Sequence, residues 1–194
     1  MARPRIPPFF EGLPQSARAL AYAEREHAGQ LRAVDRAPFI VHPVEVAQLL
    51  HHAGAPDYLV AAGVLHDTVE KTDATVDDLR ERFGARVAAL VEAVTEDPRI
   101  VDFSERKAAL RAQVAAAGPD AMRLFVADKI SKVRELRLEL FAHRFARGMY
   151  AGHLSHYRAS LALAERQLPD EPLVAQLRAQ LETTRGRTLA GVRS

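Results

Sequence analysis

A histidine and an aspartate stand side by side in an otherwise apolar stretch of the chain. In GVLHDTVEKTDAT, residues 63–75, His66 and Asp67 follow the apolar run YLVAAGVL and precede Val69. A buried carboxylate without a partner costs several kcal/mol. Asp67 therefore needs either a structural partner, such as a helix cap or a neighbouring arginine, or a metal ion. In the structural alternative, His66 is a core histidine whose hydrogen bonds are satisfied locally.

Two more metal-capable side chains occur in apolar surroundings elsewhere in the chain. FIVHPVEV places His42 at the expected start of a helix, and LFVADKI places Asp128 on another. The chain has no cysteine, which excludes thiolate ligands, disulfides and thiol catalysis. Two imidazoles and two carboxylates form a mixed nitrogen and oxygen set that suits Mn²⁺, Fe²⁺ or Zn²⁺.

These groups belong to a longer, ordered series of short motifs. The series is HAGQLR (27–32), PFIVHPVEVA (38–47), AAGVLHDTVEKTDAT (61–75), FG (83–84), VTE (94–96), ERK (105–107) and ADKI (127–130). Its order, H…HD…D, resembles the HD hydrolase superfamily. Between about Glu26 and Leu136 the chain resembles the alarmone hydrolases more narrowly. These comprise the hydrolase domain of RelA/SpoT-type enzymes and its small, single-domain, Mesh1-type relatives.

The resemblance implies a ligand set and a reaction. By the resemblance, His42, His66, Asp67 and Asp128 bind one divalent ion, most often Mn²⁺. The implied reaction removes pyrophosphate from the 3′ position of guanosine 3′,5′-bispyrophosphate. Glu70 stands four residues after His66, which in a continuous helix places both on one face. It matches the family's catalytic glutamate, which acts as general acid/base; the alternative is a solvated helix glutamate.

The resemblance also implies a set of substrate-binding cations. Arg32 matches the arginine that contacts the substrate, and Arg106 and Lys107 resemble a basic pair near the substrate phosphates. Each of these three could instead be an ordinary solvated side chain. His27 fits the family pattern as a structural histidine, whereas HLSHY (153–157) is expected at the surface.

The chain departs from the family pattern at two positions. Lys71 stands where the family has an aspartate after the catalytic glutamate, and Lys132 stands where it has an asparagine. Each lysine is four residues from a predicted metal-binding carboxylate, Lys71 from Asp67 and Lys132 from Asp128. The lysines could hold substrate phosphate, could pair with the carboxylates and leave only a nucleotide sensor, or could point away. Because all four ligands and Glu70 are present, we expect an active enzyme, with Lys71 and Lys132 among the substrate-binding residues.

Helical periodicity predicts the elements that position these residues. Apolar residues recur at helical spacing almost throughout, and no segment alternates with the period of a strand. Ser16 and Thr75 are candidate N-caps, and residues 56–70 read as one helix containing both His66 and Asp67. The expected helical segments are 14–29, 42–54, 56–70, 74–84, 85–96, 104–118, 119–140, 149–167 and 171–185. The prediction is an all-α fold of about eight to ten helices in a single compact HD-domain bundle.

The expected domain organisation is simple. Residues 1–14 read as a Pro-rich arm, residues 15–182 as the hydrolase domain, and residues 183–194 as a loose basic tail. No fixed repeat occurs, which argues against a solenoid.

Composition narrows the partners. The net charge of +2 argues against a nucleic-acid-binding face, and no apolar stretch is long enough to span a membrane. The N-terminus lacks the apolar core of a signal peptide, so a cytoplasmic protein with a small nucleotide substrate is expected. The oligomeric state stays open, a homodimer being one option. Two other functions stay open as well, namely hydrolysis of another nucleotide such as NADPH and nucleotide sensing without catalysis.

Overall fold

The regular secondary structure of the described residues is entirely helical. The structure is a computed structural model that describes residues 7–141 and 147–190. Within them, the only extended pairing is a single bridge between Leu31 and Pro38. The elements are η1 (Pro8–Phe10), α1 (Pro14–Glu26), α2 (Val41–His52), α3 (Asp57–Leu65), α4 (Thr68–Lys71), α5 (Val76–Phe83), α6 (Ala85–Val94), α7 (Phe103–Ala117), α8 (Pro119–Phe141), α9 (Arg147–Gln167) and α10 (Pro172–Ala190). The predicted all-α fold is confirmed.

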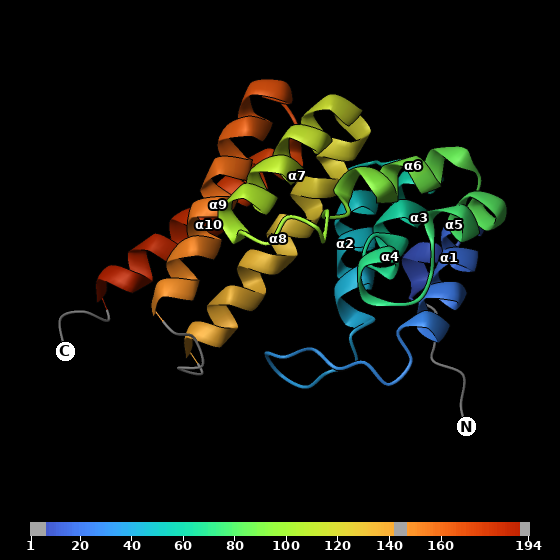
Figure 1. Ribbon diagram of the computed structural model, residues 1–194, viewed down its shortest axis with the longest axis horizontal. Helices are drawn as coiled ribbons and strands as arrows, with labels where there is room; N and C mark the ends of the chain where they lie inside the picture. Colours follow the sequence, from blue (N-terminus) through green and yellow to red (C-terminus); the bar gives the residue numbers. More distant parts are fainter. Residues whose placement is uncertain (1–6, 142–146, 191–194) are drawn as a thin grey trace. The chain divides into compact units, whose positions relative to one another are not determined.

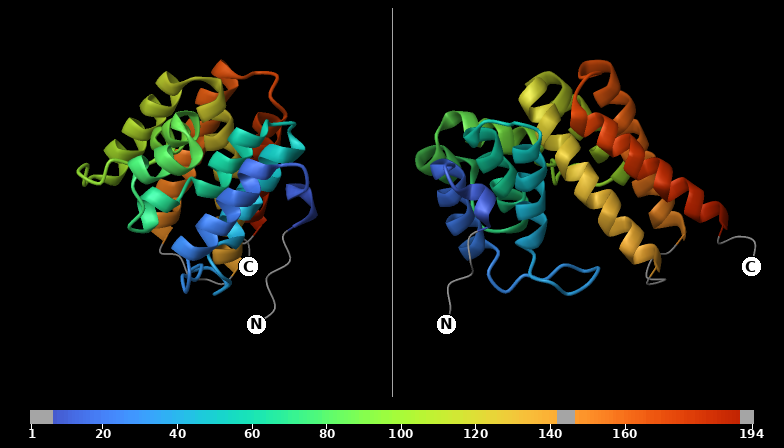
Figure 2. Two further views of the ribbon diagram at one scale, coloured as in Figure 1. Left: turned by 90° about the vertical axis from the view of Figure 1, so that its right-hand side faces the viewer. Right: turned by 180° about the vertical axis from the view of Figure 1, so that it is seen from behind.

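The chain divides into two compact units. The first unit contains residues 1–32 and 36–95, with helices up to α6, and the second contains residues 33–35 and 96–194, with α7 to α10. In the second unit α8 packs against α7, α9 and α10. Figures 1 and 2 show α8, α9 and α10 side by side. α10 continues to Ala190, so the backbone of residues 183–190 is helical where a loose tail is expected from sequence. Residues 1–6 of the predicted arm and 191–194 of the predicted tail lie outside the described residues.

Helix α1 of the first unit is capped from a distance. The carboxylate of Asp57, at the start of α3, accepts hydrogen bonds from the backbone N–H groups of Gln15 and Ser16, both at 2.9 Å. Ser16 is buried, and its hydroxyl donates to the same carboxylate. The prediction that Ser16 is the N-cap is therefore wrong, because α1 begins at Pro14 and a distant acid satisfies its first N–H groups. Thr75 does form the predicted cap of α5, as a capping box with Asp78.

The contact between α2 and α3 depends on a glycine. A Cβ atom at Gly63 would lie 2.7 Å from Cδ1 of Leu50 and 3.3 Å from Cα of Ala47, both on α2. Both of those α2 residues are fully buried. Gly63 therefore permits the two helices to pack closely. α2 carries His42, and α3 ends directly before His66.

The segment predicted as one helix over residues 56–70 is two helices. α3 ends at Leu65 and α4 begins at Thr68, so His66 and Asp67 lie in the turn between them. The side chain of His66 bonds to the carbonyl of Gly63 at 2.8 Å, and the hydroxyl of Thr68 donates to the carbonyl of Leu65 at 2.7 Å. In a continuous helix those carbonyls would accept from backbone N–H groups four residues later. Side chains have taken over the helical hydrogen bonds, which corrects the prediction.

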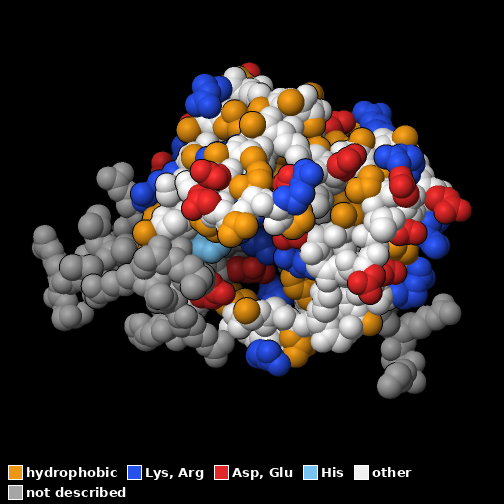
Figure 3. All heavy atoms as spheres, viewed as in Figure 1, with side chains coloured by type: hydrophobic (Ala, Val, Ile, Leu, Met, Phe, Trp, Pro, Cys, Tyr) orange, Lys and Arg blue, Asp and Glu red, His pale blue; other side chains and the backbone are white. Residues whose placement is uncertain are grey.

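The surface carries both signs of charge. On the face drawn in Figure 3, Lys and Arg side chains of the described residues are interspersed with Asp and Glu side chains. This mixture agrees with the small net charge of +2. No helix of the described ranges combines the length and the hydropathy needed to cross a membrane.

Candidate active site

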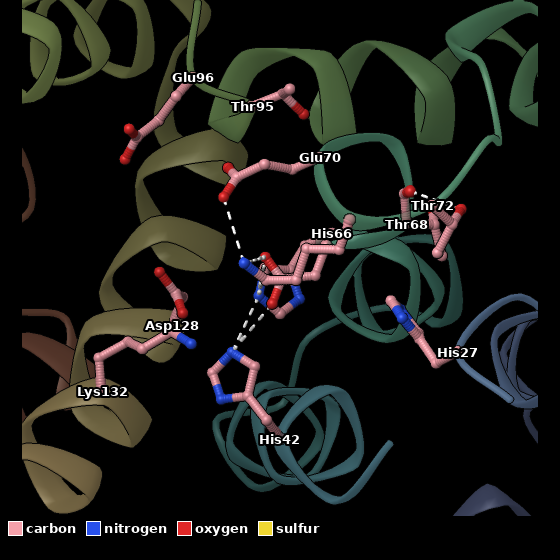
Figure 4. Close-up of polar contacts among 12 residues, drawn as sticks. His27, His42, His66, Thr68, Glu70, Thr72, Thr95, Glu96, Asp128 and Lys132 are labelled. Carbon is pink, nitrogen blue, oxygen red and sulfur yellow. Dashed lines mark hydrogen bonds and ion pairs between the residues drawn. The ribbon is translucent and has the colours of Figure 1, made fainter. Parts of the chain in front are cut away.

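His42 and His66 face each other inside the first unit. Their Nε2 atoms are 3.2 Å apart, and the two side chains are 0% and 5% exposed. Asp67 completes the group: its Oδ2 lies 3.6 Å from Nε2 of His42, and its Oδ1 lies 3.6 Å from Nε2 of His66. Figure 4 shows His42 on α2 and His66 beside α4, with their rings pointing toward one another. The sequence prediction brought these three residues together, and within the first unit the structure does the same.

The turn after α3 fixes the protonation of His66. A backbone carbonyl can only accept a hydrogen bond, so Nδ1 of His66 must carry the proton that it donates to Gly63. In the neutral ring Nε2 then keeps a lone pair, and that atom faces His42 and Asp67. A histidine with its outer N–H held by a carbonyl and its other nitrogen free to coordinate is the usual arrangement of a metal ligand.

The chemistry of this group suits a cation. Two imidazole nitrogens and a carboxylate converge at 3.2 to 3.6 Å in buried surroundings. Three electron-rich groups so placed are stabilised by a positive ion that they share. The residues present therefore fit the divalent metal implied by the sequence, with nitrogen and oxygen donors that do not by themselves select one ion.

Glu70 and Lys71 lie at the end of α4, next to this group. Nζ of Lys71 is 3.2 Å from Oε1 of Glu70 and 4.0 Å from Oδ1 of Asp67. It also lies 5.7 Å from the ring centroid of Phe39. The Glu70 side chain is 38% exposed, so solvent reaches the carboxylate. Of the three outcomes for Lys71, pointing away from the acidic groups is therefore wrong.

Arg32 lies in the loop between α1 and α2. It is half-buried next to the bridge of Leu31 and Pro38, and its backbone N–H donates to the carbonyl of Ala37 at 2.8 Å. His27, expected to be structural, is buried at the end of α1, and its Nδ1 lies 2.9 Å from Oε1 of Gln30. The sequence analysis quoted Gln30 and Phe39 inside the motifs HAGQLR and PFIVHP but gave them no role.

Asp128 lies on α8 in the second unit, behind the predicted apolar run. Phe125, Val126 and Ala127 are all buried, and Asp128 is 9% exposed. Nζ of the neighbouring Lys129 donates to Oδ2 of Asp128 at 2.6 Å and lies 4.4 Å from the Phe125 ring centroid. Lys129 was missed by the sequence analysis. The signal was present in ADKI, since a lysine in so apolar a run needs an acidic neighbour.

The other predicted cations of the second unit are paired with glutamates. Arg106 donates from Nε to Glu96 at 2.8 Å, and Lys107 binds the same carboxylate. Burial would raise the pKa of Glu96, but these hydrogen bonds and charges outweigh it and hold the pKa below its ordinary value. Nζ of Lys132 lies 3.7 Å from Oε2 of Glu135 on the next turn of α8. Arg106 and Lys107 therefore share one carboxylate, whereas Lys132 has a separate acidic neighbour.

Comparison with known proteins identifies the family to which the chain belongs. The model of the HD domain family matches residues 19–140, more than half of the chain. The chain belongs to the HD domain family. The matched range contains the HD pair at 66–67 together with His42 and Asp128.

Individual relatives place this HD domain protein more narrowly. It is 41% identical over 125 residues to human guanosine-3′,5′-bis(diphosphate) 3′-pyrophosphohydrolase MESH1, covering 63% of this chain and 69% of the relative. It is 37% identical over 121 residues to the guanosine-3′,5′-bis(diphosphate) 3′-pyrophosphohydrolase of Aquifex aeolicus strain VF5, covering 61% of this chain but only 17% of that protein. The predicted resemblance to Mesh1-type and RelA/SpoT-type hydrolases is confirmed.

Solved structures share the fold. A metazoan SpoT orthologue, described as hydrolysing ppGpp, superposes with a TM-score of 0.76 at 21% identity, covering 95% of this chain and 98% of its own. The protein lmo0812 of Listeria monocytogenes EGD-e superposes with a TM-score of 0.66 at 31% identity, covering 74% and 92%. The HD-domain helical fold predicted from sequence is confirmed by these neighbours.

Proposed function

We propose that this HD domain protein is an alarmone hydrolase, which removes pyrophosphate from the 3′ position of guanosine 3′,5′-bispyrophosphate. The observation that carries the proposal is the buried group of His42, His66 and Asp67, with His66 held in the tautomer that leaves Nε2 free. The name of the human relative, of which this chain spans 69%, supplies the substrate and the bond that is cleaved.

The metal-binding part of the proposal involves four residues. His42, His66, Asp67 and Asp128 would hold one divalent ion, and Mn²⁺ suits their mixed nitrogen and oxygen donors. Such an ion supplies Lewis acidity toward a phosphoryl oxygen and toward the attacking water. The protein's own contribution is to orient the ligating rings and to fix which ring nitrogen carries the proton. For His66 the carbonyl of Gly63 does this.

Glu70 is the proposed general acid/base. Its side chain is 38% exposed, so water reaches the carboxylate, and Nζ of Lys71 lies 3.2 Å from Oε1. In the hydrolysis, the oxygen of water forms a bond to phosphorus while the bond between phosphorus and the 3′ oxygen breaks. Glu70 accepts the proton of the water and returns it to the leaving 3′ oxygen.

The proposed substrate-binding residues are five cations. They are Arg32, Lys71, Arg106, Lys107 and Lys132. Arg106 and Lys107 share Glu96 in the structure, so substrate phosphate would compete with that carboxylate for them. The bidentate geometry of an arginine suits phosphate as well as carboxylate, which makes such an exchange chemically reasonable.

One observation favours a second function, which is nucleotide sensing without catalysis. Lys71 lies near both Glu70 and Asp67, so its charge opposes a divalent ion at the same place. A site that binds metal weakly could still bind nucleotide through its cations. Hydrolysis of another nucleotide, such as NADPH, would use the same residues with a different base pocket.

A cytoplasmic location and a hydrolase domain over residues 15–182 complete the proposal.

A phosphate-release panel tests these alternatives. Guanosine 3′,5′-bispyrophosphate, GTP and NADPH are incubated with the protein and added Mn²⁺, with EDTA and with the variant His66→Ala as controls. We expect Mn²⁺-dependent release of pyrophosphate from the alarmone alone. If calorimetry detects binding of the alarmone and no turnover occurs, the sensor function is supported instead. If phosphate is released preferentially from NADPH, the substrate is NADPH.

A further inference from the structure

Helix α4 is too short to hold its own geometry. It comprises only Thr68–Lys71, and it carries Glu70 and Lys71 at its end. A helix of one turn has almost no intrinsic stability in water, so its position depends on contacts from outside. Two backbone hydrogen bonds form its single turn. The N–H of Lys71 donates to the carbonyl of Asp67, and the N–H of Thr72 donates to the carbonyl of Thr68, both at 3.0 Å.

An outside contact reaches the last carbonyl of α4 from the loop after α1. Nε2 of Gln30 donates to the backbone oxygen of Lys71 at 2.8 Å, across 41 residues of sequence. Carbonyls at the C-terminal end of a helix have no partner within the helix, so this bond satisfies one of them. Gln30 therefore joins the loop between α1 and α2 to the residues that follow the HD pair.

His27 fixes which way the amide of Gln30 points. Because Nε2 of Gln30 must face a carbonyl, Oε1 faces Nδ1 of His27 at 2.9 Å, and that nitrogen must donate. Burial lowers the pKa of His27, although the bond to Gln30 acts in the opposite direction, so the ring is neutral with its proton on Nδ1. Consistently, Nε2 of His27 is buried and has no hydrogen-bond partner among the described residues.

The loop and the rings around it are themselves held in place. Gly29 has φ +79°, which permits the turn between His27 and Gln30. The backbone oxygen of Gln30 accepts from the N–H of Phe39 at 2.9 Å. The Phe39 ring lies 4.8 Å from the His27 ring and 5.9 Å from the His42 ring, measured between centroids. The amide of Gln30 thus starts from a fixed backbone and a fixed neighbouring ring.

We propose that Gln30 is a positioning residue that holds the end of α4, and with it the carboxylate of Glu70, and that His27 orients Gln30 for this task. The first part concerns structure alone, and the effect on turnover rests on the proposed function of Glu70. Gln30 acts through the backbone of Lys71, and within the described residues its side chain hydrogen-bonds to His27 and Lys71.

The chain supplies a matched control for Gln30. Gln15 also donates from its side-chain amide to a helix-end carbonyl, that of Phe83, at the same distance of 2.8 Å and within the same unit. Gln15→Ala removes an equivalent bond at the end of α5. A second pair of variants tests the hydrogen bond of His27 separately from its ring. His27→Asn can still donate to Gln30, whereas His27→Phe keeps an aromatic ring but cannot donate.

The first measurement is hydrogen exchange in metal-free protein, which needs no activity. Gln30→Ala and His27→Phe should raise the exchange rates of the Lys71 and Thr72 amides about tenfold. Gln15→Ala and His27→Asn should leave these two rates near those of the wild type. Gln30→Glu keeps an acceptor for His27 but turns an oxygen toward the Lys71 carbonyl, so it should act like Gln30→Ala even if the alanine variant folds poorly.

The second measurement is turnover of the alarmone with Mn²⁺. Gln30→Ala should lower kcat roughly 10- to 100-fold, because a displaced general base affects the chemical step, with a smaller rise in KM from the displaced Lys71 and with Mn²⁺ affinity nearly unchanged. Equal effects of Gln15→Ala, or unchanged exchange in Gln30→Ala, would overturn the proposal. If the wild type releases no pyrophosphate, the proposed function fails, while the exchange rates still decide whether Gln30 holds α4.

Discussion

The ammonium of Lys71 lies 3.2 Å from the carboxylate of Glu70 and 4.0 Å from that of Asp67. One cation thus contacts the proposed general base and approaches a proposed metal ligand. This relationship occurs at the position where the resemblance described above implies an acid. It also makes Lys71 the residue whose substitution is most informative about the reaction.

We predict that Lys71 acts as a cation for substrate phosphate at the edge of the site and not as a ligand or a base. The variant Lys71→Asp restores the family residue. It should raise KM for the alarmone and reduce the dependence of kcat/KM on salt, because one attraction for polyphosphate is lost. Steady-state kinetics at several ionic strengths measure both effects, with Lys71→Met separating loss of charge from its reversal. An increase in kcat by orders of magnitude with KM unmoved would mark the natural lysine as a sign of decay and favour the sensor.

Glu70→Gln tests the general acid/base directly. The amide keeps the size of the side chain but cannot accept the proton of water, so turnover should fall roughly 10²- to 10⁴-fold. Mn²⁺ affinity, measured by calorimetry, should change little. Glu81→Gln, an exposed position on α5, serves as the control. Wild-type turnover in the Glu70 variant would assign proton transfer to another group.

Metal binding should stabilise the folded protein. Addition of Mn²⁺ at about 100 times its dissociation constant should stabilise it by about 2.7 kcal/mol and raise Tm accordingly. His66→Ala should abolish the increase, whereas His52→Ala, at an exposed position on α2, should keep it. Thermal unfolding followed by circular dichroism, together with elemental analysis of the dialysed protein, provides the measurement. A metal-free wild type after Mn²⁺ loading contradicts the proposed site.

Stability should fall in acid through His156. The expectation that HLSHY lies at the surface is wrong for His156, which is 4% exposed. Its Nδ1 accepts a hydrogen bond from Arg111 at 2.8 Å, and its ring packs near Phe125. Burial, together with the charges of Lys129, Lys107 and Arg111, lowers the pKa of His156 to about 2. The unfolded chain therefore binds a proton below about pH 6.5 that the folded chain does not, so stability is complete above that pH and decreases as pH falls toward 2.

The corresponding experiment compares urea unfolding at pH 7 and pH 5. The contribution of one such histidine is at most about 1.4 kcal/mol per pH unit. His156→Gln should reduce the loss of stability between the two pH values by part of that amount, although it also weakens the protein at pH 7. His153 and His27 have lowered pKa values too, first because of burial, and so keep a residual acid sensitivity in the variant. If His156→Gln leaves the pH dependence of stability unchanged, His156 binds its proton as readily in the folded chain as in the unfolded chain.

Sequence reasoning succeeded where a local pattern decides the structure. The capping box at Thr75 and Asp78 needs only residues three apart, and the apolar run before Asp128 predicts its burial. The ligand candidates came from residue types in a fixed order, which a family pattern preserves.

Sequence reasoning failed where distant or competing hydrogen bonds decide the structure. The helix over residues 56–70 is apolar on both sides of the HD pair, so periodicity cannot reveal that His66 and Thr68 take the carbonyls of Gly63 and Leu65. The cap of α1 comes from Asp57, 41 residues from Ser16. Gln30 was overlooked for the same reason, since its partner is the backbone of Lys71.

Gly63 serves helix packing and the orientation of a histidine at once. Its missing side chain permits α2 to approach α3, and its carbonyl holds the proton of His66. A larger residue there would push against Leu50 and Ala47 and move the carbonyl with the backbone. Drift in the packing of these two helices would therefore alter the orientation of the imidazole at the same time. We expect compensating changes at positions 47 and 50 to restore folding sooner than they restore activity, so lineages that lose Gly63 should retain a folded domain that no longer catalyses.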